Sequence, residues 1–569
     1  MNPVDWGVLA ASLAFVVVYG VWAGGRSRDS AGYLLADREL RWGAVLLSMM
    51  ATQASAITFL STPGQAYQDG MRFVQFYFGL PLAMIVLAAV AVPLYRGLNV
   101  FTAYEYLERR FDAKTRTLAA FLFLVQRGLA AGLTIFAPSL ILSMGLGWDL
   151  HLTCVAIGAL VVVYTTTGGA RAVSRTQNWQ MAIMLVGFAA AFAAVVGSLP
   201  EGVGFLDALR VAGKAGKLET VSLSLDPNDR YTLWSGLLGG FFLQLSYFGT
   251  DQSQVQRLLT GRSVAASRLA LLANGLVKVP MQFVVLLLGA LVFAFYQFHA
   301  PPIFFNPQAV AKARASTDGD RLAELEAGYG ELVARREEAA RAILAAHRGG
   351  SQTAEAAATA SFTAASEAAT EVRLKAGAVI AKANPGGNPS DVNYVFLRFV
   401  ADHLPVGLVG LVLAMVFAAS MSSTSAELSA LASTTVVDVV RRHFAPHLDE
   451  RGAVVVGKVA TVFWGGFAVT FAELASRLGS LVEAVNILGS LFYGTILGIF
   501  LVGFFLRRIG GTAVFLAALI AETGVLACFA FTRVSFLWYN AVGCLAVIAF
   551  ACCLERLGQR NRARERAAP

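Results

Sequence analysis

Charge is scarce in this chain. Of its 569 residues only 14% are Asp, Glu, Lys or Arg, whereas 57% are hydrophobic and the mean hydropathy is +0.62. An ordinary soluble domain carries about 25% charged residues. The composition therefore excludes a soluble globular protein and indicates a protein of the lipid bilayer.

The sequence also lacks the pattern of a transition-metal centre or an enzyme. Its five cysteines lie in or at the ends of apolar runs, where thiols are usually small buried hydrophobes, and its six histidines lie outside such runs with no pair at ligand spacing. Neither a nucleophile with its base nor a phosphate-binding loop is present. We therefore expect no enzyme and no transition metal.

Apolar runs long enough to cross a bilayer recur along nearly the whole chain. A spanning helix needs about 20 apolar residues, whereas a β-barrel would show alternating segments of about ten residues, which are absent here. The first run has neither a basic start nor a small-residue cleavage site, so we expect a retained helix. The sequence predicts an all-α membrane protein with about 13 spans, at 4–24, 43–67, 74–96, 117–145, 148–168, 175–199, 232–256, 268–297, 403–436, 453–475, 480–506, 511–532 and 535–554.

Basic residues concentrate in alternate loops. One set of loops contains Arg26, Arg28, Arg38, Arg41, Arg109, Arg110, Lys114, Arg116, Arg171, Arg257, Arg262, Arg441, Arg442, Arg451, Arg507, Arg508 and the tail 555–569. The positive-inside rule places this set in the cytoplasm, so we expect a multi-pass protein of the inner or plasma membrane with its N-terminus outside. The net charge of +9 is dispersed rather than gathered in one patch, which argues against a nucleic-acid partner.

One long segment differs from the rest. Residues 305–394 are rich in Ala, Glu and Arg, with an RGGS break at 348–351 and a Gly/Pro/Asn stop near the end. They predict an extracytoplasmic helical insertion, either a hairpin over the external mouth or a solvated spacer. It separates spans 1–8 (1–304) from spans 9–13 (395–554), which a basic cytoplasmic tail follows (555–569).

Polar or irregular stretches interrupt several spans, and a bilayer tolerates them only where they line a cavity or meet partners. The second span contains MATQASAITFLSTPG (50–64), and the seventh contains QLSYFGTDQSQVQR (244–257). Interrupted helices in corresponding places indicate an inverted-repeat transporter, whereas each break alone is also explained by a Pro or Gly kink. Spans 2–6 and 7–11 would form an inverted five-helix repeat, with one extra helix before it and two after it.

At these residues the chain resembles the solute:sodium symporter family. The motifs are YLLADREL (33–40), TAYEYLERRF (102–111), GGARAVSRTQNWQ (168–180), YFGTDQSQVQRLLTGRS (247–263) and MSSTS (421–425), and LTIFAPSLIL (133–142) is most similar to the iodide, monocarboxylate and multivitamin branch. The resemblance implies the LeuT-like inverted-repeat fold, alternating access, a sodium ion as coupling ion and a small-molecule solute. No obligatory protein partner is evident.

The resemblance implies a sodium site between the unwound second span and the ninth span. The matching positions are the carbonyls of Ala51, Ala54 and Ala419 and the oxygens of Ser422 and Ser423. A hard cation takes oxygen ligands, which agrees with this set. Nine of the sixteen residues from Ser420 to Thr435 carry a hydroxyl, and the others favour helix packing.

The family's substrate positions fall on residues of several spans. They are Gln53, Thr58, Tyr77, Arg127, Gln244, Tyr247, Lys278 and Asn486, with Tyr247 similar to an inner aromatic gate. Arg127 coincides with the arginine that sialic acid carriers use against a carboxylate, and its fork suits such a group. We therefore hypothesise a carboxylate-bearing solute. The alternative is an internal ion pair of Arg127 with Glu427, Asp251 or Glu483.

Three positions depart from the family pattern. Gln177 stands where an acid is usual, which weakens the case for a second sodium ion, and Glu427 could partly restore that charge. Asp251 replaces a common Asn and could instead cap a broken helix or meet Arg257. The sequence thus favours a sodium-coupled symporter. A proton-coupled or uncoupled carrier of a sugar or amino acid, or a transporter-like solute sensor, are the alternatives.

Overall fold

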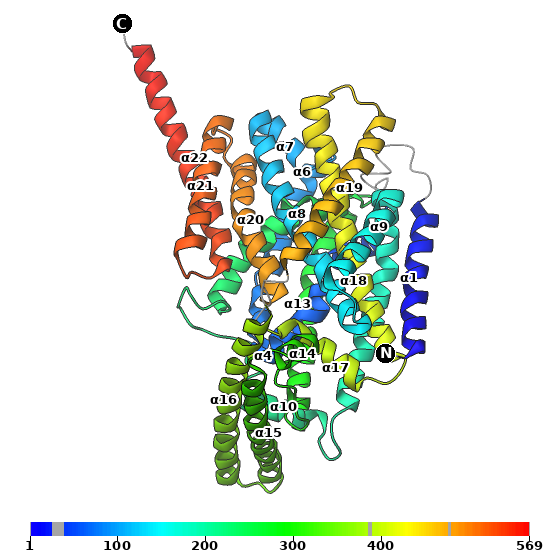
Figure 1. The fold of residues 1–569 in the computed structure, drawn as a ribbon. Coiled ribbons are helices and arrows are strands. Elements are labelled where there is room, and N and C mark those ends of the chain that lie inside the picture. The colour runs from blue at the N-terminus through cyan, green and yellow to red at the C-terminus, as the bar shows by residue number, and fades with distance from the viewer. Residues whose placement is uncertain (1, 25–38, 99, 385–389, 476–478, 568–569) are drawn as a thin grey trace.

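The computed structural model describes residues 2–24, 39–98, 100–384, 390–475 and 479–567. Within these ranges regular structure is helical apart from one isolated bridge between Leu40 and Gly261, which confirms the predicted all-α class. Long helices stand side by side in a bundle, with a projecting hairpin at one end (Figure 1). The main helices are α1 (Pro3–Gly24), α3 (Trp42–Gln53), α4 (Ala56–Asp69), η2 (Met71–Tyr77), α5 (Leu80–Ala89), α6 (Ala91–Leu98), α7 (Tyr104–Arg110), α8 (Ala113–Leu146), α9 (Leu150–Gly197), α10 (Phe205–Lys214), η3 (Ser235–Gly239), α11 (Gly240–Gly249), α12 (Gln252–Leu259), α13 (Val264–Phe295), α14 (Pro307–Arg314), α15 (Gly319–Arg348), α16 (Gln352–Ala383), η4 (Val392–Tyr394), α17 (Val395–His403), α18 (Leu408–Thr434), η5 (Thr435–Phe444), α19 (Glu450–Ala475), α20 (Leu481–Phe505), α21 (Gly511–Phe531) and α22 (Phe536–Ala567).

The number of spans differs from the predicted thirteen. Eleven described helices are long and apolar enough to cross a bilayer, and the bent pair α3 and α4 raises the number to twelve. The expected seventh span, 232–256, forms three short helices, η3, α11 and α12, and is not among them. The prediction of about thirteen is therefore not confirmed.

One predicted loop is absent and another is shorter than predicted. The segment between the fifth and sixth expected spans continues as helix in α9, which is 48 residues long and bends at Gly169, where φ is 57°. Arg257, predicted in a cytoplasmic loop, is fully buried in α12 and donates to Ser174 at 2.7 Å. Both errors arise because a break in hydropathy marks a bend or a buried polar segment as readily as a loop.

The remaining basic loops gather at the end of the bundle opposite the hairpin (Figure 1). Arg110 of α7 donates to the Leu506 carbonyl at 2.8 Å, and Arg116 at the start of α8 pairs with Asp438 of η5 at 2.8 Å. The sequence-predicted positions Arg26, Arg28 and Arg38, and most of the YLLADREL motif, lie outside the described residues.

The break between α3 and α4 bends the chain by 59°. Ala54 ends α3 with φ −78° and ψ 73°, and Ser55 is extended before α4 begins. The last carbonyls of α3 consequently have no partner within their own helix. In a bilayer those oxygens need other donors, which makes this break a place where side chains or a cation must approach.

Close backbone packing holds α4 in place. A Cβ at Gly64 would lie 1.9 Å from the Val392 carbonyl oxygen, and a Cβ at Gly289 of α13 would lie 2.1 Å from the Pro63 carbonyl oxygen. Small residues of this kind let membrane helices approach each other closely. The helix α4, which follows the break, is thus packed closely against both α13 and η4.

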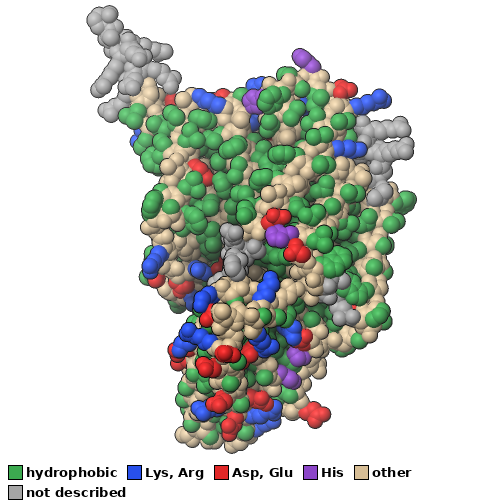
Figure 2. All heavy atoms as spheres, in the orientation of Figure 1, with side chains coloured by type: hydrophobic (Ala, Val, Ile, Leu, Met, Phe, Trp, Pro, Cys, Tyr) green, Lys and Arg blue, Asp and Glu red, His purple; other side chains and the backbone are tan. Residues whose placement is uncertain are grey.

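Residues 319–383 form a two-helix hairpin that projects from the bundle. Its helices α15 and α16 pack along each other and join at Gly349 and Gly350, where Gly350 has φ 68°. Figure 2 shows hydrophobic side chains over most of the bundle surface, whereas acidic and basic side chains cover the hairpin. The hairpin therefore has the surface of a water-exposed element.

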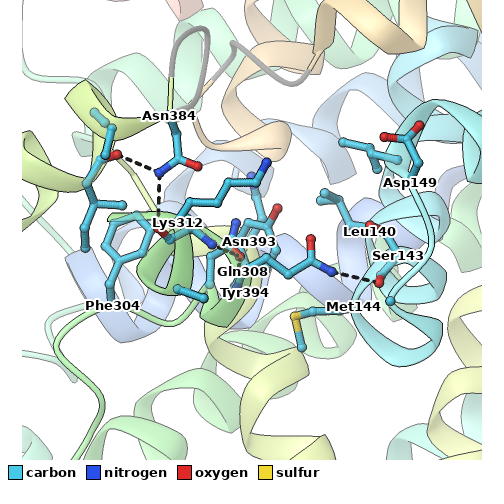
Figure 3. A pocket seen from close by; sticks show the side chains of 18 of the residues that line it. Leu140, Ser143, Met144, Asp149, Phe304, Gln308, Lys312, Asn384, Asn393 and Tyr394 are labelled. Carbon is cyan, nitrogen blue, oxygen red and sulfur yellow. Dashed lines mark hydrogen bonds between the residues drawn. The ribbon is translucent and has the colours of Figure 1, made fainter. Parts of the chain in front are cut away.

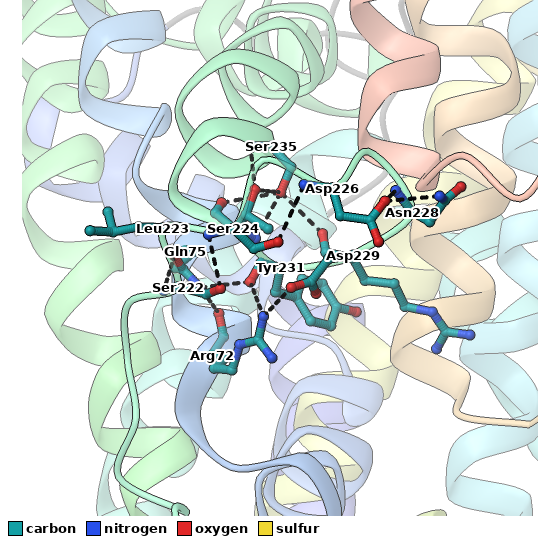
Figure 4. Close-up of polar contacts among 12 residues, drawn as sticks. Arg72, Gln75, Ser222, Leu223, Ser224, Asp226, Asn228, Asp229, Tyr231 and Ser235 are labelled. Carbon is teal, nitrogen blue, oxygen red and sulfur yellow. Dashed lines mark hydrogen bonds and ion pairs between the residues drawn. The ribbon is translucent and has the colours of Figure 1, made fainter.

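The loop between α10 and η3 is fastened to η2 at the hairpin end (Figure 4). Arg72 pairs with Asp229 at 2.5 Å, and the Gln75 amide donates to the Tyr231 carbonyl at 2.8 Å. The Gln75 amide oxygen accepts from the Ser222 backbone at 3.0 Å. These bonds order a long connection next to the hairpin.

Replacing Gly289 with Ala tests the close packing of α4. The new Cβ would overlap the Pro63 carbonyl, so we expect a loss of about 1–3 kcal/mol in stability. Gly466→Ala is the matched control, because nothing lies within 4 Å of its added Cβ. Thermal unfolding of the purified protein in detergent measures the difference, and equal unfolding temperatures for the two variants would contradict the packing.

Candidate functional site

A buried cavity of about 110 Å³ lies in the middle of the bundle, and we call it the central cavity. The structure brings together all eight sequence-predicted substrate positions in its wall: Gln53, Thr58, Tyr77, Arg127, Gln244, Tyr247, Lys278 and Asn486. They come from α3, α4, η2, α8, α11, α13 and α20. Their role in solute binding stays a prediction, but their convergence is a property of the fold.

The predicted sodium ligands lie beside this cavity, at the break between α3 and α4. The Ser422 hydroxyl donates to the Ala51 carbonyl at 2.8 Å, and the Ser423 hydroxyl donates to the Ala419 carbonyl at 3.0 Å. Ala54 forms the break itself, and all five residues are buried. Buried hydroxyl and carbonyl oxygens at an unwound helix form the kind of donor set that suits a hard monovalent cation.

Gln177 of α9 lies directly behind these oxygens. Its amide oxygen accepts from Ser48, and its amide nitrogen donates to Thr52 at 3.0 Å and to the Ser422 carbonyl at 3.4 Å. A neutral amide here ties three helices together without adding a negative charge. The expectation that the loss of an acid weakens a second sodium position stays a prediction.

The other hydroxyls of α18 have partners typical of helix packing. Ser433 donates to the Ser429 carbonyl at 2.8 Å and accepts from Gln256 at 3.0 Å, and Ser425 donates to the Ser422 carbonyl at 3.2 Å. Thr424 donates to Thr134 of α8 at 3.0 Å. These contacts are typical of helix packing, and the assignment of Ser422 and Ser423 as sodium ligands stays a prediction.

Arg127 is held by two acidic side chains. Its guanidinium pairs with Asp251 and lies 3.0 Å from a Glu427 oxygen, and it also donates to the Tyr493 hydroxyl at 2.6 Å. Thr134 donates to the other Glu427 oxygen at 2.9 Å. The internal ion pair therefore exists with two of the three expected partners, whereas Glu483 pairs with Arg230 instead.

Asp251 has both a capping and a pairing role. It accepts from the backbone of Ser253 at 2.9 Å at the start of α12, and its other oxygen holds Arg127 and accepts from Tyr493 at 3.0 Å. Arg257, the alternative partner, contacts Ser174 and Gln256 instead. The break between α11 and α12 thus holds a carboxylate that contacts α8 through Arg127 and α20 through Tyr493.

Lys278 has a different environment from Arg127. Its side chain is 2% exposed, and its nitrogen lies 5.7 Å from the centroid of the Tyr77 ring. Among the residues that the structure describes, no hydrogen bond or ion pair reaches this ammonium, which lines the central cavity. A buried charge without an acidic partner in a membrane protein is a strong candidate for contact with a ligand.

Several residues of the cavity were missed from the sequence. Tyr493 and Thr134 line it, and each lies seven residues after a predicted position, Asn486 and Arg127, on the same face of its helix. That spacing of two helical turns could have identified them. Asn274, which accepts from the Gln53 amide at 3.0 Å behind the cavity wall, lies one turn before Lys278 on α13 and has the same kind of signal.

A larger cavity of about 850 Å³ opens at the hairpin end. Gln308, Lys312, Asn384 and Tyr394 are among its lining residues, and Gln308 donates to the Ser143 carbonyl at 3.0 Å (Figure 3). It is wide enough to admit a small solute.

A polar cluster lies between the two cavities. Asn393, which lines the larger one, accepts from Ser61 at 2.8 Å and from the Leu481 backbone at 3.2 Å, and Ser61 in turn accepts from the Val482 backbone at 3.3 Å. Val482 lines the central cavity. We call these four residues the Asn393 cluster. It joins α4, η4 and the start of α20 and separates the central cavity from the hairpin end.

The family model of the sodium:solute symporter family matches residues 33–321 and 372–521. This chain belongs to that family. The gap in the match, 322–371, falls within the hairpin. The family and the relatives found are transporters rather than enzymes, as predicted.

Among curated relatives, the chain is 27% identical to the sodium-dependent multivitamin transporter of Oryctolagus cuniculus over 511 residues, covering 88% of this chain and 66% of the relative. It is 28% identical to the human sodium-coupled monocarboxylate transporter 1, covering 87% and 68%, and 27% identical to the human sodium/iodide cotransporter, covering 88% and 66%. The chain thus spans about two thirds of their lengths. The predicted branch is confirmed.

A solved structure shows the same fold. The substrate-bound outward-open state of a Na⁺-coupled sialic acid symporter matches with a TM-score of 0.73 at 20% identity, covering 97% of this chain and 98% of that one. This likeness confirms the predicted inverted-repeat fold of the symporter.

Replacing Ser422 with Ala tests the sodium site. Loss of one buried oxygen ligand costs about 1–3 kcal/mol, so the sodium concentration that half-saturates thermal stabilisation should rise about 5- to 150-fold. Ser433→Ala, the same change in the same helix, should leave it unchanged. The measurement compares sodium with potassium on purified protein. An unchanged half-saturation in Ser422→Ala would exclude Ser422 as a ligand.

Replacing Arg127 with Ala tests the ion-pair network. The change leaves two buried carboxylates unpaired, and we expect a loss of about 3–5 kcal/mol in stability. Adding Asp251→Asn and Glu427→Gln should recover part of that loss, because the uncompensated charges are gone. Arg341→Ala, on the exposed face of α15, serves as control. Equal thermal unfolding of Arg127→Ala and the control would argue against the network.

Proposed function

We propose that this chain is a sodium-coupled symporter that imports a small organic solute bearing a carboxylate. Transport would proceed by alternating access around the central cavity. Family membership supports the class of transporter, and the buried oxygens at Ala51 and Ser422 support sodium as the coupling ion. The observation that supports a carboxylate on the solute is the unpaired ammonium of Lys278 in the cavity wall.

Charge balance connects the ion to the solute. The four charged groups at the cavity are Arg127, Lys278, Asp251 and Glu427, and their formal charges cancel. A sodium ion would add one positive charge to this buried region, where charges interact strongly because the dielectric constant is low. A carboxylate beside Lys278 would restore neutrality. The two ligands would therefore favour each other's binding.

Lys278 is better placed than Arg127 to bind that carboxylate. Both acidic partners of Arg127 are within the protein, so its guanidinium would need to exchange them for a solute. Lys278 needs no such exchange. We therefore assign Arg127 to the wall of the cavity, together with Tyr247 and Tyr493, and Lys278 to the solute.

The orientation follows from the arrangement of charge. Basic loops gather at the end opposite the hairpin, and the positive-inside rule places that end in the cytoplasm. The hairpin, the larger cavity and the start of α1 would then face outward. The cell membrane is the proposed location, with the C-terminal tail inside.

The number of sodium ions that move with each solute molecule limits how far the solute can be concentrated in the cell. Sodium moving with a monovalent anion carries no net charge, so the membrane potential contributes nothing, and a tenfold sodium gradient supplies about 1.4 kcal/mol. Accumulation would then reach about tenfold. One ion per solute agrees with the neutral Gln177 behind the sodium position.

Replacing Lys278 with Met tests the proposed contact between the Lys278 ammonium and the carboxylate of the solute. A thermal-shift screen of propionate, pyruvate and glucose, with and without sodium, first finds a stabilising acid. We expect Lys278→Met to lower the affinity of the protein for that acid at least tenfold, whereas stabilisation by sodium remains. Lys278→Arg should recover part of the affinity. Uptake into proteoliposomes then measures transport and the charge moved per solute.

Other outcomes would support other functions. Uptake without sodium dependence would indicate a proton-coupled or uncoupled carrier, and binding without uptake would indicate a solute sensor. Unchanged acid affinity in Lys278→Met, or stabilisation by glucose alone, would exclude the proposed carboxylate contact.

A further inference from the structure

A third cavity lies where the hairpin meets the bundle, and it shares the lining residues Phe304 and Ser390 with the larger cavity at the hairpin end. Its volume is about 400 Å³, within the usual range for small-molecule sites, and we call it the seam cavity. Tyr67 and Phe293 enter it from the last turns of α4 and α13, and Tyr329 and Arg373 enter it from α15 and α16. It shares no lining residue with the central cavity.

Three basic side chains and one acidic side chain line the seam cavity. Arg373 is already paired with Asp391, whose two oxygens lie 2.8 and 2.7 Å from its nitrogen. Lys217 and Arg336 have no such partner among the described residues. The wall therefore keeps two positive charges that no carboxylate in direct contact neutralises.

The polar contacts of these two side chains are incomplete. Arg336 is 7% exposed and donates to the Tyr296 carbonyl at 3.1 Å, while its Nε has no hydrogen-bond partner. Lys217 donates to the Gln68 carbonyl. Burial lowers the pKa of Lys217, and the nearby charge of Asp69 raises it. An anion would compensate the lost hydration of Arg336 and would add a partner for the half-buried Lys217.

The other walls are aromatic. Tyr67 contacts Phe293 edge to face, with ring centroids 5.6 Å apart, and the Lys217 nitrogen lies 5.0 Å from the Phe293 centroid. Tyr329 faces the same space from the hairpin. Flat apolar surfaces beside unpaired cations suit a ligand with a ring and a negative group, since aromatic rings pack edge to face or offset.

We propose that the seam cavity binds a small aromatic carboxylate, with the carboxylate between Lys217 and Arg336 and the ring against Tyr67 and Tyr329. This inference goes beyond the proposed transport function, because the site is built partly from the hairpin. Binding here requires neither sodium nor Lys278.

Benzoate binding to the purified full chain tests the site. Titration calorimetry is performed in the Lys278→Met background, without sodium, so that the central cavity does not contribute. We expect saturable binding that weakens at least tenfold in Arg336→Gln and in Lys217→Met. Thr370→Trp, at an exposed position of the cavity wall, should also abolish it by filling the space.

Matched controls separate this site from general effects. Arg341→Gln, the same change on the exposed face of the same helix, should leave benzoate binding intact. Benzamide lacks the charge and should not bind, and inorganic phosphate lacks the ring and should bind more weakly. Absence of saturable benzoate binding, binding unaffected by both Arg336→Gln and Thr370→Trp, or phosphate binding as tight as benzoate would overturn the proposal. Because sodium is absent and Lys278 is replaced, none of these results depends on the transport function.

Discussion

In a bilayer every backbone carbonyl needs a partner, and this constraint organises the centre of the molecule. The two interrupted segments, at Ala54 and at Thr250, release carbonyls that no helical neighbour can bond. Ser422 donates to one of them, and Tyr95 and Tyr104 donate to the Gly249 and Thr250 carbonyls at 2.6 and 2.9 Å. The proposed sodium oxygens and the capping Asp251 both occur at these breaks.

The second requirement is that buried charges have partners. Arg127 has two acidic partners, which fix α8, α12 and α18 to one another. Lys278 has none, although it lies in the same cavity wall. This contrast is the basis for proposing that Arg127 stabilises the fold and that Lys278 binds the solute. In that proposal, a formal charge near zero would favour the entry of one cation together with one anion.

The sequence predicts the helical class and the position of the cavity because both depend on local signals. Polar residues in apolar spans must face an interior, as Gln53, Lys278 and Gln244 do, and the resemblance to the symporter family implies that they share one cavity. Pairing is not local, and three acidic residues were equally suitable partners for Arg127 until the fold placed two of them beside it. Hydropathy likewise could not distinguish the bend at Gly169 from a loop, nor the buried Arg257 from a cytoplasmic one. The seam cavity was not foreseen, because its cations come from segments far apart in the chain.

The short segment after the hairpin connects two parts of the protein. Asp391 holds the hairpin through Arg373, and Asn393, two residues later, holds α4 and the start of α20. Any outward swing of α20 away from α4 must break the bonds of Asn393 or pull this segment along. In the second case the displacement reaches the hairpin through the ion pair of Asp391 with Arg373, so the polar contacts beside the central cavity and the projecting hairpin are mechanically linked.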